Sequence, residues 1–141
     1  LSAPPKLKRI RMIRTMPYPG FPTDVQAQMM ALTTICEGTS VIVENIFESR
    51  FKHIGELLRF GARINVEGRM AVIEGVKHLN GANVRATDLR GGSAMILAGL
   101  NAYSITEITE IHHIDRGYEN PEKVLSELGA DIKRVKDDEK N

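Results

Sequence analysis

Residues 8–47 read KRIRMIRTMPYPGFPTDVQAQMMALTTICEGTSVIVENIF and contain the pattern that decides the fold. Residues 8–15 alternate basic and apolar side chains, which is the period of a half-buried strand. Three prolines follow at once and exclude regular structure, because each fixes its own φ and restricts the residue before it. Thr23 then stands as a helix N-cap with Gln26 in capping-box position. Apolar residues recur at helical spacing, and a second strand is expected over residues 40–47.

The same alternation of helices and strands continues to the end of the chain, which predicts an α/β protein. Turn-forming residues and the change of apolar period from about two to about 3.6 place the boundaries. The expected elements are a helix over 48–60, strands over 64–66 and 70–73 joined by a turn at 67–68, a strand over 83–86, a helix capped by Thr87 and covering 94–100, a strand over 105–111, a helix from 120–121 to 129, and a strand over 131–135.

An internal repeat links the two halves of the chain. Three anchors recur in the same order 64 to 68 residues later: Thr23-Asp24 as Thr87-Asp88, Arg50 as Arg116, and Gly61-Ala62 as Gly129-Ala130. Self-similarity of this kind is typical of repeated supersecondary units. We expect repeat units at about 7–73 and 83–135. Two such units do not complete a set that buries its faces, so the chain is expected to be part of a larger domain.

Composition limits the function classes. The chain has 141 residues, 19 Lys and Arg against 18 Asp and Glu, and 42% hydrophobic residues, which is typical of one soluble globular domain. A net charge of +1 argues against non-specific nucleic-acid binding. The single cysteine excludes an internal disulfide framework and a Cys-based zinc site. The most apolar run, residues 94–100, is far shorter than the roughly 20 residues of a membrane span. A start at Leu1 is compatible with a piece of a longer protein.

Two acidic residues are candidates for chemistry. The proline-rich loop delivers Asp24 to the start of a helix, where a carboxylate can accept a proton from a substrate hydroxyl. The alternative is that it only stabilises the helix dipole. Asp88 repeats this position and is followed by Arg90 and two glycines. That group can bind an anion through the guanidinium and backbone N–H groups, or it can form a structural ion pair. Both interpretations stay open.

Arg50 and Arg116 occupy equivalent positions of the repeat, each after an expected strand. Strand ends in α/β proteins often face a ligand crevice, and arginine suits phosphate and carboxylate groups. His112 and His113 are metal-ligand types, but on the expected strand they would point to opposite faces, which favours a structural role. Cys36 lies on the apolar face of the first helix and is expected to be a buried, inert thiol.

Four longer motifs carry a family resemblance. Residues 17–24 read PYPGFPTD, 48–51 read ESRF, 86–90 read ATDLR and 113–119 read HIDRGYE. In this order, over nearly the whole chain, they resemble the C-terminal third of the UDP-N-acetylglucosamine 1-carboxyvinyltransferases. The resemblance implies an inside-out α/β barrel built from βαβαββ-type units. Residues 1–141 would form a partial C-terminal domain with two of its three units.

The resemblance also implies an activity. The family transfers the enolpyruvyl group of phosphoenolpyruvate to the 3-hydroxyl of UDP-N-acetylglucosamine and releases phosphate. This is the first committed step of peptidoglycan synthesis, in the bacterial cytoplasm, and it serves cell wall biogenesis, cell shape and cell division. No metal or organic cofactor is implied. The expected partners are the two substrates and the missing N-terminal part of the enzyme, which carries the family's catalytic cysteine and lysine. The chain alone is therefore expected to be inactive.

The family's site residues fall on six positions of this sequence. Asp24 matches the aspartate that binds the sugar nucleotide and is the proposed base for its hydroxyl. Arg116 matches an arginine that binds phosphoenolpyruvate, and Ile46 a position that contacts the sugar largely through its backbone. The other matches to active-site positions are Arg50, Asp88 and Arg90. Two alternatives remain, a shikimate-pathway enolpyruvyl transferase and a non-catalytic fragment that binds a sugar nucleotide. Neither a nucleic acid nor a membrane is an expected partner.

Overall fold

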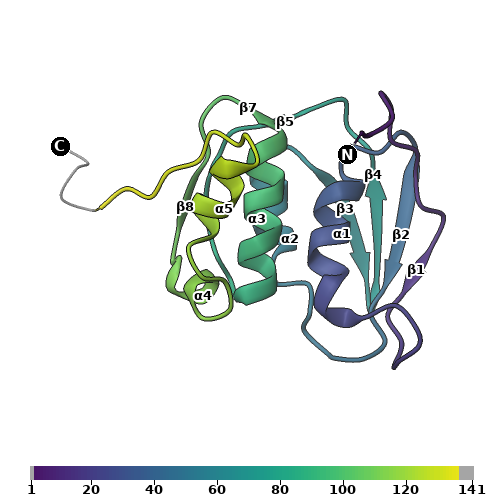
Figure 1. The fold of residues 1–141 in the computed structure, drawn as a ribbon. Helices are drawn as coiled ribbons and strands as arrows, with labels where there is room; N and C mark the ends of the chain where they lie inside the picture. The colour runs from purple at the N-terminus through teal and green to yellow at the C-terminus, as the bar shows by residue number, and fades with distance from the viewer. Residues whose placement is uncertain (1, 137–141) are drawn as a thin grey trace.

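The computed structural model describes residues 2–136 and has an α/β architecture, as the sequence predicts. Helices α1 (Gln26–Thr33) and α3 (Leu89–Asn101) lie side by side in the middle of the molecule (Figure 1). A four-stranded sheet covers one side of this helical layer, and the short strands of the second half cover the other. The two central helices, α1 and α3, are therefore inside and the sheets outside.

The remaining elements are short. They are β1 (Ile13–Arg14), the 3-10 helix η1 (Thr23–Val25), β2 (Thr39–Val43), α2 (Ile54–Arg59), β3 (Arg63–Glu67), β4 (Met70–Glu74), β5 (Leu79–Asn80), β6 (Asn83–Arg85), β7 (Ala102–Tyr103), β8 (Glu107–Thr109), α4 (His112–Asp115) and α5 (Pro121–Glu127). None of the helices in the described part of the chain is long and apolar enough to cross a membrane.

The first half follows the order β1–α1–β2–α2–β3–β4, which is a βαβαββ unit. Its sheet has the strand order β1-β2-β4-β3, with β1 parallel to β2 and the other two pairs antiparallel. The second half begins the same way, because β6 and β8 pair in parallel around α3, with Val84 opposite Ile108. Strands β5 and β7 form a further parallel pair that the sequence did not indicate. The unit boundaries at about 7–73 and 83–135, and the three-unit domain, stay predictions.

The core lies between the helical layer and the first sheet. Ile42 of β2 and Ile73 of β4 point inward and are fully buried, as are Met30 of α1, Met95 of α3 and Phe60. Alanines on the facing sides of the two central helices are buried as well: Ala27, Ala31, Ala94 and Ala98. Small side chains let the two helices approach closely, so this helix pair fixes how the two halves of the chain meet.

Several strand boundaries differ from the prediction. The strand over 8–15 is reduced to Ile13–Arg14 with single bridges at Lys8 and Thr15, because only a few of its residues have a partner strand. The strand over 40–47 ends at Val43, and the strand over 105–111 is only Glu107–Thr109.

The last expected strand, residues 131–135, is not a strand. Alternation of apolar residues is not enough for a ladder without a neighbouring strand. Arg134 instead pairs with Asp115 and Glu122 at 2.7 and 3.1 Å and holds the segment against α4 and α5.

One helix prediction was wrong in its limits, and one short helix was not predicted. The helix over 48–60 is confined to Ile54–Arg59, since Ser49 has a left-handed φ of 58° that interrupts helical geometry. Residues 112–115 form the short helix α4, although His112 and His113 were expected on a strand, and the helix follows Glu110 at a φ of 56°. Gly92 explains how α4 packs on α3, because a Cβ at this position would meet Ile114 Cγ1 at 2.5 Å.

Candidate active site

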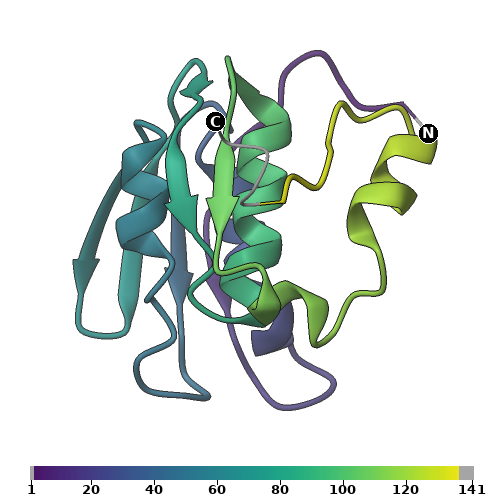
Figure 2. The same ribbon diagram turned by 90° about the vertical axis from the view of Figure 1, so that its left-hand side faces the viewer.

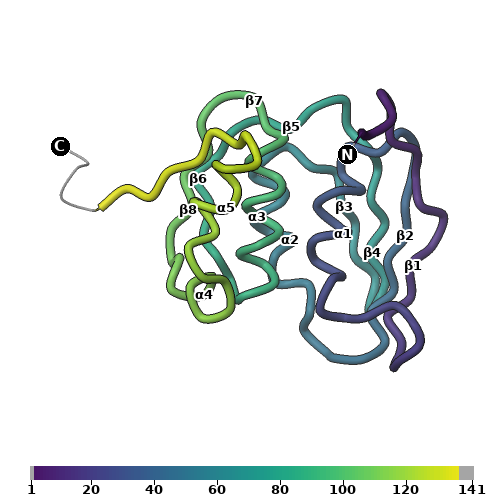
Figure 3. The backbone as a smooth tube through the Cα atoms, in the orientation of Figure 1, coloured from purple at the N-terminus to yellow at the C-terminus, as the bar shows by residue number. Residues whose placement is uncertain are grey.

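The predicted site residues come from segments at one edge of the molecule. In Figure 1 the starts of α1 and α3, the loop after β2 and helix α4 all lie at the lower edge, and Figure 2 shows the same grouping from the side. Figure 3 shows the chain between β2 and α2 running along this edge as a loop. The packing of α1 beside α3, with both N-termini at the same end, produces the grouping.

Asp24 and Arg90 form the contact that joins the two halves of the site. Asp24 lies in η1 and Arg90 in the first turn of α3, and Arg90 Nε donates a hydrogen bond to Asp24 Oδ1 at 2.6 Å. The Asp24 side chain is 66% exposed and that of Arg90 33%. An exposed pair of this kind contributes about 0–1 kcal/mol to stability. It leaves the carboxylate oriented by a cation and open to a ligand.

The two threonines that precede the aspartates do not cap helices. Asp88 is itself the N-cap of α3, and its Oδ1 accepts a hydrogen bond from Gly91 N at 2.6 Å. The prediction of Thr87 as cap was therefore wrong by one residue. Thr23 makes no capping contact and donates its hydroxyl to the Glu44 carboxylate instead, and the expected capping box with Gln26 does not form. Thr23 donates its hydroxyl hydrogen to a buried carboxylate, and a hydrogen bond to a charged acceptor is stronger than one between neutral groups.

A small cavity of ≈ 10 Å³ lies between the two halves, and it has room for about one water molecule. It is lined by Thr23, Gln26, Ala27, Arg50, His53, Asp88 and Arg90. Three residues of this lining, Arg50, Asp88 and Arg90, belong to the site predicted from sequence, and Thr23 directly precedes Asp24. The cavity places Arg50, Asp88 and Arg90 around one point.

His53 is a cavity residue that sequence reasoning missed. Its side chain is 3% exposed, and burial lowers its pKa to about 4, although the charge of Asp88 acts in the opposite direction. His53 is therefore neutral at pH 7. Its Nε2 and the Oε1 of Gln26 are buried without a hydrogen-bond partner among the described residues. No sequence signal marked His53, because a single histidine between Lys52 and Ile54 has no distinguishing pattern.

Glu44 is the second residue that the sequence did not reveal. It follows β2, is 2% exposed, and accepts hydrogen bonds from three side chains and two backbone N–H groups. The donors are Thr15 Oγ1 at 2.9 Å, Thr23 Oγ1 at 3.0 Å, Gln26 Nε2 at 3.2 Å, Ile46 N at 3.0 Å and Phe47 N at 3.2 Å. Burial would raise the pKa of Glu44, but the hydrogen bonds from Thr15, Gln26, Phe47 and Ile46 together outweigh it and hold the pKa below its ordinary value.

The three remaining predicted residues have different surroundings. Ile46 is half-buried and is held through its backbone N–H by Glu44. The Arg50 guanidinium lies over the Phe47 ring at 4.2 Å from its centroid, which keeps the cation near the cavity. Arg116 is exposed at the end of α4, at the same edge, but it does not line the cavity. The structure thus gathers Arg50 with Asp88 and Arg90, and leaves Arg116 on the rim.

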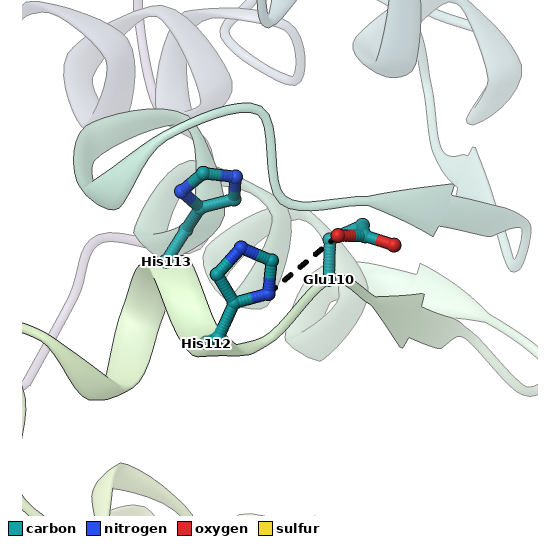
Figure 4. A group of neighbouring side chains, drawn as sticks. All are labelled: Glu110, His112 and His113. Carbon is teal, nitrogen blue, oxygen red and sulfur yellow. Dashed lines mark ion pairs between the residues drawn. The ribbon is translucent and has the colours of Figure 1, made fainter.

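Figure 4 shows a group of possible metal ligands that the sequence interpretation dismissed. His112 and His113 lie in α4, not on a strand, and with Glu110 they offer three ligand atoms within 4.8 Å of one another. His112 Nδ1 is 3.5 Å from Glu110 Oε2. Two imidazoles and one carboxylate suit a transition metal, but ligand bonds of about 2.0–2.2 Å require these side chains to rotate inward.

The neighbouring hollow has a different character. Lys52 and Arg85 line it together with Glu110 and His113, and its volume is ≈ 430 Å³. Two cations beside the histidines oppose a bound metal ion and suit an anion.

Cys36 is buried at 2% exposure as predicted, and burial raises the pKa of its thiol. It has the properties of an inert thiol.

Similarity to known proteins extends over almost the whole chain. Residues 2–138 match the family model of EPSP synthase (3-phosphoshikimate 1-carboxyvinyltransferase). The chain is 60% identical over 133 residues to the UDP-N-acetylglucosamine 1-carboxyvinyltransferase of Geobacter metallireducens, which covers 94% of this chain and 32% of that protein. It is 63% identical over 123 residues to UDP-N-acetylglucosamine 1-carboxyvinyltransferase 1 of Clostridium acetobutylicum, covering 87% and 29%. The resemblance seen in the motifs is thereby confirmed.

Solved structures give the same fold. The enolpyruvyl transferase NikO from Streptomyces tendae matches with a TM-score of 0.82 and 32% identity, over 92% of this chain and 30% of that one. An EPSP synthase from Acinetobacter baumannii matches with a TM-score of 0.63 and 21% identity, over 94% and 29%, and supports the fold alone. The chain spans about a third of the length of these relatives.

Proposed function

Because the chain belongs to the EPSP synthase (3-phosphoshikimate 1-carboxyvinyltransferase) family, we propose that it supplies part of the active site of an enolpyruvyl transferase. The proposed reaction moves the enolpyruvyl group of phosphoenolpyruvate to the 3-hydroxyl of UDP-N-acetylglucosamine and releases phosphate. The choice of sugar nucleotide is supported by relatives of that name at 56–63% identity, against 19–21% for the EPSP synthase structures. The shikimate-pathway alternative is disfavoured on the same ground.

The observation that carries this proposal is the exposed Asp24 carboxylate, oriented by Arg90 at the edge of a cavity lined by Arg50 and Asp88. In the proposed reaction Asp24 takes the proton of the attacking hydroxyl, whose oxygen bonds to C2 of phosphoenolpyruvate while the C2=C3 double bond opens and C3 takes up a proton. C3 then loses a proton, the C2=C3 double bond forms again, and the bond between C2 and the phosphate oxygen breaks to release phosphate. Both substrates are polyanions, so Arg50, Arg90 and Arg116 would stabilise charge that persists through addition and elimination.

The wider setting is also part of the proposal. Residues 1–141 would form two of three units of one domain, and the remaining part of the same enzyme would supply the family's cysteine and lysine. The setting is peptidoglycan synthesis in the bacterial cytoplasm, and the chemistry needs no metal or organic cofactor. Ile46 would contact the sugar through its backbone, and Arg116 would bind phosphoenolpyruvate.

A chimeric enzyme tests the activity. The matching third of the Geobacter metallireducens relative is replaced by this chain, and phosphate release is measured with phosphoenolpyruvate and UDP-N-acetylglucosamine. We expect turnover, and a loss of about 10²–10⁴-fold in kcat for Asp24→Asn, the usual contribution of a general base. Asp131→Asn, another exposed carboxylate outside the site, is the matched control. Two outcomes contradict the proposal. One is turnover of phosphoenolpyruvate with shikimate 3-phosphate but not with UDP-N-acetylglucosamine, and the other is full activity of Asp24→Asn.

The isolated chain distinguishes the remaining alternative. It should release no phosphate from the two substrates, because it holds only part of the site. Calorimetric titration with UDP-N-acetylglucosamine should show no tight binding for the same reason. Tight binding without the rest of the enzyme would instead favour a non-catalytic sugar-nucleotide module.

A further inference from the structure

We propose that Glu44 is a positioning residue of this site, whose buried carboxylate fixes the segments that carry Asp24, Ile46 and Arg50 relative to one another. The expected effect of Glu44 on turnover rests on the proposed function. Its effect on the placement of these segments rests on the structure alone. Glu44 itself is 2% exposed, so it acts through other residues and does not touch substrate.

The donors to Glu44 belong to the segments that hold the site. Thr23 directly precedes Asp24, and its hydroxyl is shared between the two Glu44 oxygens at 3.1 and 3.0 Å. Ile46, itself a predicted site residue, donates its backbone N–H at 3.0 Å. Gln26 donates one amide hydrogen to Glu44 at 3.2 Å and also contacts the Arg50 carbonyl oxygen at 3.5 Å. One carboxylate therefore connects η1, α1 and the loop that follows β2.

The network continues behind the carboxylate. Thr15 donates its hydroxyl to Glu44 at 2.9 Å, and its oxygen accepts the backbone N–H of Asn45 at 2.8 Å. The start of the loop after β2, residues 45–47, is thus held by the Thr15 hydroxyl and the Glu44 carboxylate directly after the strand ends at Val43. This arrangement turns the loop along the site edge instead of extending the sheet.

A charge in this position is unfavourable for stability alone. A buried carboxylate loses its hydration, and apolar residues of similar volume often stabilise a protein as well or better. The donors to Glu44 are neutral groups, and they hold its pKa below the ordinary value in spite of burial. The geometric function follows from chemistry, because an ionised carboxylate only accepts hydrogen bonds and can bring several donors to one point.

Glu44→Gln tests this with almost no change in shape. The amide replaces one acceptor oxygen by an NH₂ group, which then faces donors that it cannot accept from. In the chimeric enzyme we expect kcat to fall about 10²-fold, the loss typical of a displacement of about 1 Å at a reacting group. The KM for UDP-N-acetylglucosamine should rise, while the KM for phosphoenolpyruvate should stay within about twofold because Arg116 lies outside the network.

Glu56→Gln is the matched control. Glu56 is also a buried carboxylate, 7% exposed, and accepts the Arg85 N–H at 3.0 Å, but its contacts lie in α2 and β6. Glu56→Gln should lower the melting temperature without raising the KM for UDP-N-acetylglucosamine relative to the KM for phosphoenolpyruvate. Thr23→Val removes a single donor to Glu44. It should raise the KM for UDP-N-acetylglucosamine less than Glu44→Gln does, again without changing the KM for phosphoenolpyruvate. It keeps the test valid if Glu44→Gln does not fold.

Hydrogen exchange of the 141-residue chain measures the positioning independently of activity. In Glu44→Gln the amides of Ile46 and Phe47 should exchange at least about tenfold faster, while amides of α3 keep their rates. Unchanged exchange at Ile46 and Phe47 overturns the inference whatever the enzyme does. If the unmutated chimera is inactive, the proposed function fails, and the exchange result still decides the positioning. Equal effects of Glu44→Gln and Glu56→Gln on kcat and both KM values also overturn it.

Discussion

Lowering the pH from about 7.5 to about 5 should destabilise the chain through His53, the buried histidine beside the cavity. The folded protein holds the pKa of His53 at about 4, against an ordinary value of 6.5, mainly because burial disfavours the imidazolium. Between these two values the unfolded chain binds a proton that the folded chain does not bind. Stability is therefore full above about pH 6.5 and falls as the pH decreases toward 4.

The magnitude follows from the two pKa values. A shift of one pKa unit corresponds to about 1.4 kcal/mol, so the complete loss would be about 3 kcal/mol. At about pH 5, where only part of the window has been crossed, the loss should be about 2 kcal/mol. The low pKa of Glu44 also reduces stability in acid, but only below the ordinary carboxylate range, so it contributes little at this pH.

Urea unfolding at the two pH values measures this loss. His53→Gln cannot be protonated, so its free energy of unfolding should lose about 2 kcal/mol less than that of the unmutated chain. His78→Gln is the control, since His78 is exposed and only stacks on Tyr103 with ring centroids 4.8 Å apart. If His53→Gln and the unmutated chain lose the same free energy between the two pH values, the reasoning from burial is refuted.

Three further predictions concern packing and the C-terminal segment. Gly92→Ala should lower the free energy of unfolding by about 1–3 kcal/mol, because its methyl group would overlap Ile114. Gly55→Ala should raise the free energy of unfolding by about 0.5–1 kcal/mol, because its methyl group meets open space in α2. Urea titration of both variants measures the two changes. Phe60→Ala should cost about 3–5 kcal/mol, measured by thermal melting, since the ring is fully buried. Arg134→Ala should speed amide exchange in α5 without changing α3, and an unchanged α5 would show that the ion pairs are not needed there.

Element order and most of the candidate site were predictable from the sequence, and the limits of elements were not. Apolar periodicity located α3 and the β3–β4 hairpin, because it reports which face of one element is buried. It located α1 as well but indicated the wrong face, since Leu32 is exposed whereas Met30 and Ala31 are buried. It overestimated the strand over 131–135, since a strand also needs a partner that periodicity does not reveal. It also missed that residues 112–115 form a helix, which is what brings His112 and His113 to one side with Glu110.

The sequence by itself determined the family, the α/β alternation and the candidate site residues, because motifs such as those around Asp24 and Asp88 are local in the chain. Only the tertiary structure decided which of these groups meet. Asp24 and Arg90 are separated by 66 residues and touch because α1 packs beside α3. The role of Glu44 depends in the same way on burial and on donors from four segments. Local sequence specifies residue types and periods, whereas contacts between charges depend on how the packed elements are placed in space.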